Sequence, residues 1–192
     1  MESLRGQFLV AMPEMGDDRF RESVIYLVGH GDEGAMGLVV NQSVEDMRFA
    51  DILEELKLGD EDELIHLSDD IKNRQVLRGG PVQKSRGFVL HSSDYFKVGN
   101  SYEVTDEICL TATLDILKAI AFKNSPTEAL FALGYCGWSP GQLEQEIRGN
   151  GWLTVPFSRD LLFALPIEAR YDAALARLGI TRATLSAAAG HA

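Results

Sequence analysis

Strand-like segments in this sequence occur in clusters instead of alternating regularly with helix-like segments. Runs rich in large apolar and β-branched residues cover 7–12, 23–30, 35–41, 74–82, 86–93, 102–111, 128–137 and 152–157. A glycine-bearing turn at 31–34 joins two of these runs and predicts a β-hairpin. The clustering predicts an α+β or mixed α/β chain. Its 192 residues suit one domain over 1–192, in which 180–192 forms a short helix or a loose tail.

Apolar residues at helical spacing predict amphipathic helices between the strands. Phe49, Ile52, Leu53 and Leu56 fall at i, i+3, i+4 and i+7 and form one apolar stripe. Three further helices are predicted at 113–124, 140–148 and 166–179.

The stretch GYCGWSPGQLEQEIRGNGW, residues 134–152, contains both tryptophans of the chain at a predicted strand-to-helix corner. Ser139 and Gln142 match an S-x-x-Q capping box, and Pro140 takes the first helical position. Glycines permit the tight turn. The aromatic side chains of Tyr135, Trp138 and Trp152 either pack the corner or wall a pocket, and packing is the commoner use of such residues.

One polar residue of this corner is not explained by local helix chemistry. Glu144 and Arg148 are expected to pair on the outer face of the helix. Glu146 receives no structural role from the pattern. We therefore expect Glu146, together with Trp138 and the neighbouring backbone N–H groups, to belong to a recognition surface.

The charge of the chain is negative and unevenly distributed. Net charge is −11, and residues 45–70 hold eleven acidic and two basic residues, which gives −9 for that segment. The acidic run GDEDE at 59–63 lacks the glycine turn and terminal glutamate of a calcium loop and is interpreted as a solvated loop. No segment is read as strongly basic, which opposes direct binding of duplex nucleic acid.

No pattern in the sequence predicts a metal or a cofactor. The histidines are scattered, without HExxH, paired C-x-x-C or 2-His-1-carboxylate spacing. The RGGPV segment at 78–82 lacks the Lys-Ser/Thr that follows the glycines of a phosphate loop. Gly79 and Gly80 are instead interpreted as a bulge or as close packing of strands. Asn41, which ends a hairpin strand, is expected to bond a loop or a ligand.

Catalytic constellations are equally weak. His91, Ser92 and Asp94 have the residue types of a triad, but neighbours in a strand point to opposite faces, so a relay among them is not expected. Cys136 is expected to pack as a small hydrophobe. Without a recognisable acid/base or nucleophile pair, a non-enzymatic module is favoured.

Cysteine usage and hydropathy predict the compartment. Cys109 and Cys136 are too few for a disulfide framework, and the apolar run at 8–12 is too short for an export signal. No run reaches the length of a membrane span. The expected location is a reducing cytoplasm, without a membrane partner.

Four segments together resemble the YqgE/AlgH family of bacterial proteins. They are FLVAMPEMGDDRFRESVIYLVGHGDEGAMGLVVN at 8–41, RGGPVQKSRGFVLHSS at 78–93, GYCGWSPGQLEQEIRGNGW at 134–152 and LLFALPIEARYDAALARLGI at 161–180. The resemblance implies an α+β fold in which a bifurcated, partly barrel-like mixed β-sheet is surrounded by helices. The family has no agreed activity, although some members are labelled transcriptional regulators. Cys136 departs from the alanine or serine expected there.

Two functions from different classes follow. The first is a binding or regulatory module that contacts another protein and acts without direct DNA contact. The second is a small-molecule-binding protein or enzyme with a pocket formed by the RGGPV, FVLH and GYCGW segments. The candidate ligand- or partner-binding residues are Asn41, Gly79, Gly80, Pro81, His91, Tyr135, Gly137, Trp138, Gln142 and Glu146.

Overall fold

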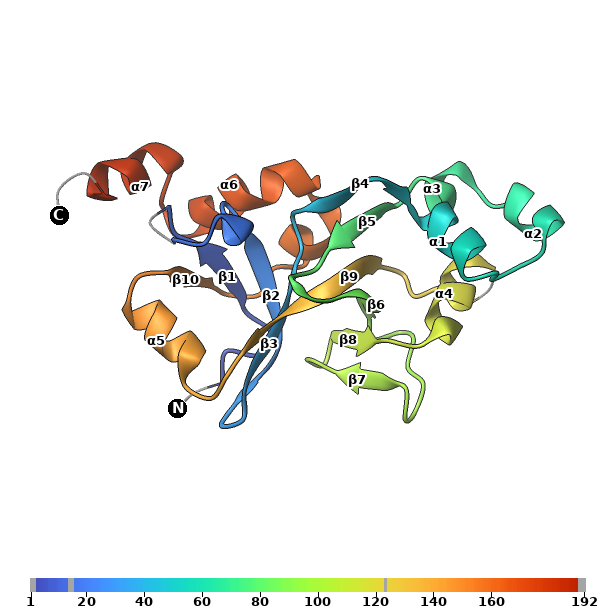
Figure 1. Ribbon diagram of the computed structural model, residues 1–192, viewed down its shortest axis with the longest axis horizontal. Coiled ribbons are helices and arrows are strands. Elements are labelled where there is room, and N and C mark those ends of the chain that lie inside the picture. Colours follow the sequence, from blue (N-terminus) through green and yellow to red (C-terminus); the bar gives the residue numbers. More distant parts are fainter. Residues whose placement is uncertain (1–2, 14–15, 123, 190–192) are drawn as a thin grey trace.

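The computed structural model describes residues 3–13, 16–122 and 124–189 as a curled sheet with helices around it (Figure 1). The strands are β1 Phe8–Ala11, β2 Val24–Gly31, β3 Gly34–Val39, β4 Ser43–Arg48, β5 Gln75–Arg78, β6 Val82–Ser92, β7 Ser101–Glu103, β8 Ile108–Thr111, β9 Ala129–Trp138 and β10 Trp152–Val155. The α-helices are α1 Phe49–Glu55, α2 Glu61–Ile65, α3 Asp69–Lys72, α4 Leu114–Ala121, α5 Gln142–Arg148, α6 Arg170–Arg177 and α7 Arg182–Ala189. Short turns of other helix types are η1 Asp18–Phe20, η2 Asp160–Ala164 and η3 Ile167–Ala169.

The sheet branches at β9. The main order is β10-β1-β2-β3-β9-β6-β8-β7, while β5 also pairs with β9 and carries β4 on its other edge. Residues Phe131–Leu133 of β9 pair in parallel with β5, whereas Cys136–Trp138 pair antiparallel with β3. Figure 1 shows β9 running diagonally between the two parts of the sheet. The expected α+β fold with a bifurcated mixed sheet is confirmed.

Both faces of β1, β2 and β3 are buried, because successive side chains of a strand point to opposite sides. One face packs on α6 and holds Phe8, Val10, Val24, Tyr26, Ala174 and Leu175. The other face packs on α5 and holds Leu9, Ile25, Leu27, Leu143, Trp138 and Trp152. A third apolar cluster joins α1 and α4 to β5 and β9, through Phe49, Leu53, Val76, Ile116, Leu117 and Phe131.

Several local predictions hold. The hairpin at 31–34 forms between β2 and β3, with Gly31 opposite Gly34. The stripe of α1 is buried at Phe49, Ile52 and Leu53, although Leu56, just after the helix, is 42% exposed. The predicted helix at 166–179 divides into η3 and α6. Of the predicted short helix or loose tail at 180–192, Arg182–Ala189 form α7, and residues 190–192 lie outside the described part.

The interpretation of the acidic run at 59–63 as a loop is wrong. The backbone N–H of Glu63 donates to Asp60 at 2.8 Å, and the Glu63 carboxylate accepts the N–H of Asp60 at 3.1 Å. This capping box begins α2 within the run. Ser68 begins α3 as an N-cap whose hydroxyl oxygen accepts the backbone N–H of Ile71 at 3.4 Å. Strand β4 and the turn η2 were also not predicted, because their sequences lack clear periodicity.

Candidate functional site

Both tryptophans donate their indole N–H groups to one carboxylate at the corner between β9 and α5. Trp138 Nε1 lies 2.9 Å and Trp152 Nε1 2.8 Å from Oε2 of Glu146. The indole rings meet edge to face with their centroids 6.0 Å apart. They are 7% and 2% exposed. A charged acceptor makes stronger hydrogen bonds than a neutral one, so Glu146 holds both rings in place.

Gln142 connects Glu146 to the end of β9. Its Nε2 donates to Oε1 of Glu146 at 2.9 Å, and its Oε1 accepts the backbone N–H of Ser139 at 3.0 Å. The second bond is the glutamine half of the predicted capping box. The helix nevertheless begins at Gln142 instead of Pro140, because Gly141 precedes it with a left-handed φ of 74°.

These bonds correct two expectations about the corner. The absence of a structural role for Glu146 is wrong, since its carboxylate joins the corner cluster of Trp138, Gln142 and Trp152. Glu144 bonds Nε2 of His30 on β2 at 3.0 Å instead of forming the expected pair on its own helix. Recognition by this corner stays a prediction. Of the candidate binding residues in the corner, Gly137 and Gln142 are exposed.

His91 is a core residue of β6. Its imidazole is fully buried, with Nδ1 2.9 Å from the carbonyl oxygen of Ser92 and Nε2 2.9 Å from Oγ1 of Thr111. Burial lowers the pKa of His91 from its ordinary value. The hydroxyl of Ser92 donates to Asp94 at 2.5 Å. His91, Ser92 and Asp94 are therefore not arranged as a relay.

Asn41 and Cys136 both have structural partners. Asn41 Oδ1 accepts the N–H of Val24 at 2.7 Å, and Nδ2 donates to the carbonyl of Glu22 at 2.9 Å. The expected bond to a loop is thus present, and a ligand role for Asn41 stays a prediction. Burial raises the pKa of Cys136 to about 12, and its Sγ lies 3.5 Å from the carbonyl oxygen of Gly79. The thiol packs in the core, as expected.

Close packing of glycines brings β5, the start of β6 and β9 together. A side chain on Gly80 would collide with the backbone of Tyr135, and one on Gly79 with the carbonyl of Gly134. Gly134 has a φ of 74° and packs against the carbonyl of Gly80. The predicted close strand packing at Gly79 and Gly80 is confirmed.

A bulge follows directly in β6. Val82 pairs with Tyr135 and Gly87 with Leu133, so residues 83–86 stand opposite a single residue of β9. All four bulge residues are exposed. A bulge bends its strand and changes the direction of its side chains. It presents Lys84 beside the end of β5.

A cavity of about 390 Å³ lies at this crossing and is here named the basic pocket. Its cations are Arg19, Arg78 and Lys84, and its other lining residues are Phe20, Val39, Gln42, Val44, Gly80, Pro81 and Leu133. Arg19 pairs with Asp17 at 2.6 Å. Within the described residues, Arg78 and Lys84 form no ion pair. The pocket therefore combines apolar walls with two positive charges that have no ion-pair partner in the described part of the chain.

The expectation that no segment is strongly basic missed a local run of cations. Residues 71–93 contain five basic residues and no acidic one. This run was the available sequence signal for Arg78 and Lys84, but the net charge of −11 obscured it. The tertiary structure adds Arg19 from η1 to the same cavity.

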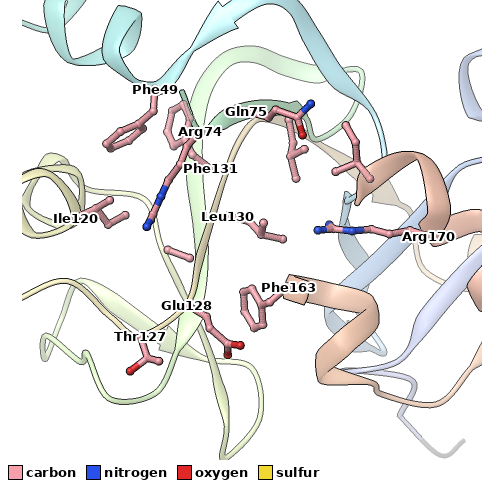
Figure 2. A pocket seen from close by; sticks show the side chains of 13 residues that line it. Phe49, Arg74, Gln75, Ile120, Thr127, Glu128, Leu130, Phe131, Phe163 and Arg170 are labelled. Carbon is pink, nitrogen blue, oxygen red and sulfur yellow. The ribbon is translucent and has the colours of Figure 1, made fainter. Parts of the chain in front are cut away.

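A second cavity, of about 290 Å³, separates β5 and β9 from the C-terminal helices. Figure 2 shows Arg170 pointing into it from α6, with Arg74 on the opposite side and Leu130, Phe131 and Phe163 along its walls. We name it the Arg170 cavity. No sequence motif indicated Arg170, which lies inside a helix prediction.

The candidate residues do not share one pocket. Gly80 and Pro81 line the basic pocket, whereas none of five cavities formed by described residues is lined by His91, Tyr135 or Trp138. Over residues 3–13, 16–122 and 124–189, no cluster of three or more His, Cys, Asp or Glu is placed to hold a metal. No helix in these ranges is long and apolar enough to cross a membrane.

Known proteins resemble this chain over almost its whole length. A family model described as AlgH-like matches residues 8–183. A UPF0301 protein of Mesorhizobium japonicum is 56% identical over 98% of this chain and 93% of its own, and one of Methylobacterium is 51% identical over 98% and 90%.

Solved structures agree with the fold. The solution structure of the AlgH protein from Pseudomonas aeruginosa has a TM-score of 0.77 at 43% identity, over 99% of this chain and 96% of that one. A Corynebacterium diphtheriae protein has a TM-score of 0.68 at 20% identity, over 92% and 87%, and shares the fold.

Proposed function

The chain belongs to the AlgH-like family, and on that premise we propose that it is a non-enzymatic binding module whose site is the basic pocket. The observation that carries the proposal is the pair Arg78 and Lys84, which line one cavity without an ion-pair partner among the described residues. In a chain of net charge −11, such a pair is a local site for anions.

The chemistry of the pocket favours a multiply charged anionic group. Arginine presents a planar fork of donors to carboxylates and phosphates, and lysine adds a mobile point charge. Arg19 also lines the pocket, but it already pairs with Asp17. The apolar residues Phe20, Val39 and Leu133 suit the neighbouring carbon atoms of a ligand. A phosphate ester or a cluster of carboxylates, on a small molecule or on a partner protein, fits these features.

The regulatory role implied by the family resemblance is compatible with this proposal. A module that takes up an anionic ligand or an acidic segment of another protein acts on regulation through that partner. Direct contact with DNA is not needed. The proposed site includes Arg78, Gly80 and Pro81 of the RGGPV segment, whereas no residue of the FVLH and GYCGW segments lines it.

The test is an NMR titration of the labelled chain with pyrophosphate and with a hexaglutamate peptide. We expect saturable shifts of the amide signals of Arg78, Gly80 and Lys84. The double variant Arg78→Gln/Lys84→Gln should weaken binding about 10-fold or more, because charge-assisted hydrogen bonds are lost. Both positions are exposed, so its stability should stay within about 0.5 kcal/mol of the parent.

Arg177→Gln is the matched control, since it removes an exposed cation at the end of α6. It should leave the titration unchanged. If the control and the double variant weaken binding equally, net charge alone explains the loss, and this result would contradict a specific site. No saturable shift with either probe would contradict the proposal outright.

A further inference from the structure

The guanidinium of Arg170 is buried, and it forms no ion pair with any described residue. The residue is 3% exposed, and no carboxylate among the described residues lies within ion-pair distance of it. Its Nε donates to the carbonyl of Leu165 at 3.0 Å and its Nη1 to the carbonyl of Val40 at 2.6 Å. Removing a charge from water is costly, so a buried charge usually has a partner of opposite charge. Burial also lowers the pKa of Arg170 to about 10.

Donors of this guanidinium remain available on the cavity side. An arginine has five N–H donors, and the two carbonyls take two of them. Figure 2 shows the nitrogen end of Arg170 projecting into the Arg170 cavity, toward Leu130. A planar fork in this position matches the two oxygens of a carboxylate.

The remaining walls select against other anions. Leu130, Phe131 and Phe163 offer apolar surface beside the guanidinium. Glu128 lines the same cavity and would repel a second negative charge, although it pairs with Arg159 at 2.7 Å. Arg74 also lines the cavity, but it forms an ion pair with Asp70 at 3.1 Å. One buried cation opposed by one carboxylate suits a monoanion better than a phosphate ester, which carries about two charges.

We propose that the Arg170 cavity binds a small monocarboxylic acid with an apolar body, its carboxylate on Arg170 and its hydrocarbon part against Leu130 and Phe163. A cavity of about 290 Å³ holds a compact ligand of this kind. It shares no lining residue with the basic pocket, so the two sites are independent.

The test uses three probes of similar size with the full chain: phenylacetate, the neutral 2-phenylethanol and the dianionic phenyl phosphate. Phenylacetate should bind saturably with a dissociation constant on the order of 1 mM or below and shift the amide signals of Leu130 and Phe163. 2-Phenylethanol should bind about 10-fold to 100-fold more weakly, because it leaves Arg170 unpaired. At the Arg170 cavity, followed by the amide signals of Leu130 and Phe163, phenyl phosphate should also bind more weakly than phenylacetate.

Two variants separate binding from folding. Arg170→Lys keeps the charge but loses the fork, and should weaken phenylacetate binding about 10-fold. Arg170 also donates to two backbone carbonyls, so its replacement could disturb the fold. Leu130→Trp is therefore a second variant, which fills the cavity and leaves the guanidinium unchanged. It should abolish binding while the folded amide spectrum is retained. Leu114→Trp adds the same ring on α4, outside the cavity, and should bind normally.

Four results would overturn the proposal. At the Arg170 cavity, they are no saturable binding of phenylacetate, equal binding of the neutral probe, tighter binding of phenyl phosphate, and unchanged binding by folded Leu130→Trp. The variant Arg78→Gln/Lys84→Gln should bind phenylacetate as the parent does. Failure of the basic pocket and failure of the Arg170 cavity are thereby distinguished.

Discussion

At the scale of single residues, Glu146 is the acceptor on which the corner cluster depends. Glu146→Ala leaves two buried indole N–H groups without their acceptor. We expect the free energy of unfolding to fall by about 2–6 kcal/mol, at roughly 1–3 kcal/mol for each unsatisfied group. Urea denaturation followed by intrinsic fluorescence measures this directly, because the two tryptophans of the chain both lie in the cluster.

Gln145→Ala on the exposed face of α5 is the control for this prediction and should change stability by less than about 0.5 kcal/mol. Gln142→Ala should cost on the order of 1 kcal/mol or less, as a capping-box partner. A loss at Glu146 no greater than that of the control would mean that the indole bonds do not stabilise the fold.

His91 should make stability depend on pH near neutrality. Its folded pKa is lowered from 6.5, so the unfolded chain takes up the proton first as pH falls. This contribution to stability is complete above the unfolded pKa and is lost as pH falls toward the folded pKa. The free energy of unfolding should therefore decrease between about pH 7.5 and pH 5.5, by at most about 1.4 kcal/mol per pH unit.

The measurement is urea denaturation at constant ionic strength across that range, for the parent and for His91→Gln. In the variant, the free energy of unfolding should depend less steeply on pH, whatever its absolute value. His66→Gln, at an exposed position, should keep it. Asp94 affects stability only at lower pH, because its pKa in the folded chain is lowered from 3.8. An identical slope in the parent and His91→Gln would assign the pH dependence to other groups.

At the scale of elements, the crossing of β5, β6 and β9 depends on residues without side chains. Gly80→Ala would place a Cβ against the backbone of Tyr135, which cannot move without separating two strands. We expect a loss of more than about 3 kcal/mol in the free energy of unfolding. The built-in control is Gly31→Ala, where a Cβ meets nothing within 4 Å and the change should stay within about 0.5 kcal/mol.

Thermal and urea unfolding of these two variants would check the packing. Similar stability of both would show that the strands can separate at Gly80 at little cost. The same crossing also holds the basic pocket, since Gly80 and Pro81 line it and the bulge of β6 supplies Lys84. Loss of the crossing should therefore remove anion binding along with stability.

At the scale of the whole molecule, charge predicts what the chain does not bind. The segment 45–70 carries −9 and precedes the basic run at 71–93, and β4 pairs with β5 across the two. We expect no tight duplex binding by the purified chain at physiological salt, because repulsion of phosphates exceeds the attraction of a few cations. Fluorescence anisotropy with labelled duplexes is the measurement. A submicromolar, sequence-specific complex would contradict it.

The sequence by itself determined the features that depend on near neighbours. The 31–34 turn, the stripe of α1 and the bond between Gln142 and Ser139 follow from residues a few positions apart. The family follows from motifs that are continuous in the chain. Helix and strand periods, turn residues and caps act over such short separations, so they can be read without a structure.

Only the tertiary structure decided which distant groups meet. Glu146 was unexplained by its helix because one of its partners, Trp152, comes from the next strand, and Arg170 reaches a carbonyl 130 residues away at Val40. Arg19 from η1, Arg78 from β5 and Lys84 from the bulge of β6 meet in one cavity only in the folded chain. Periodicity places a side chain on a face of its own element, but the partner opposite that face is set by the packing of the whole chain.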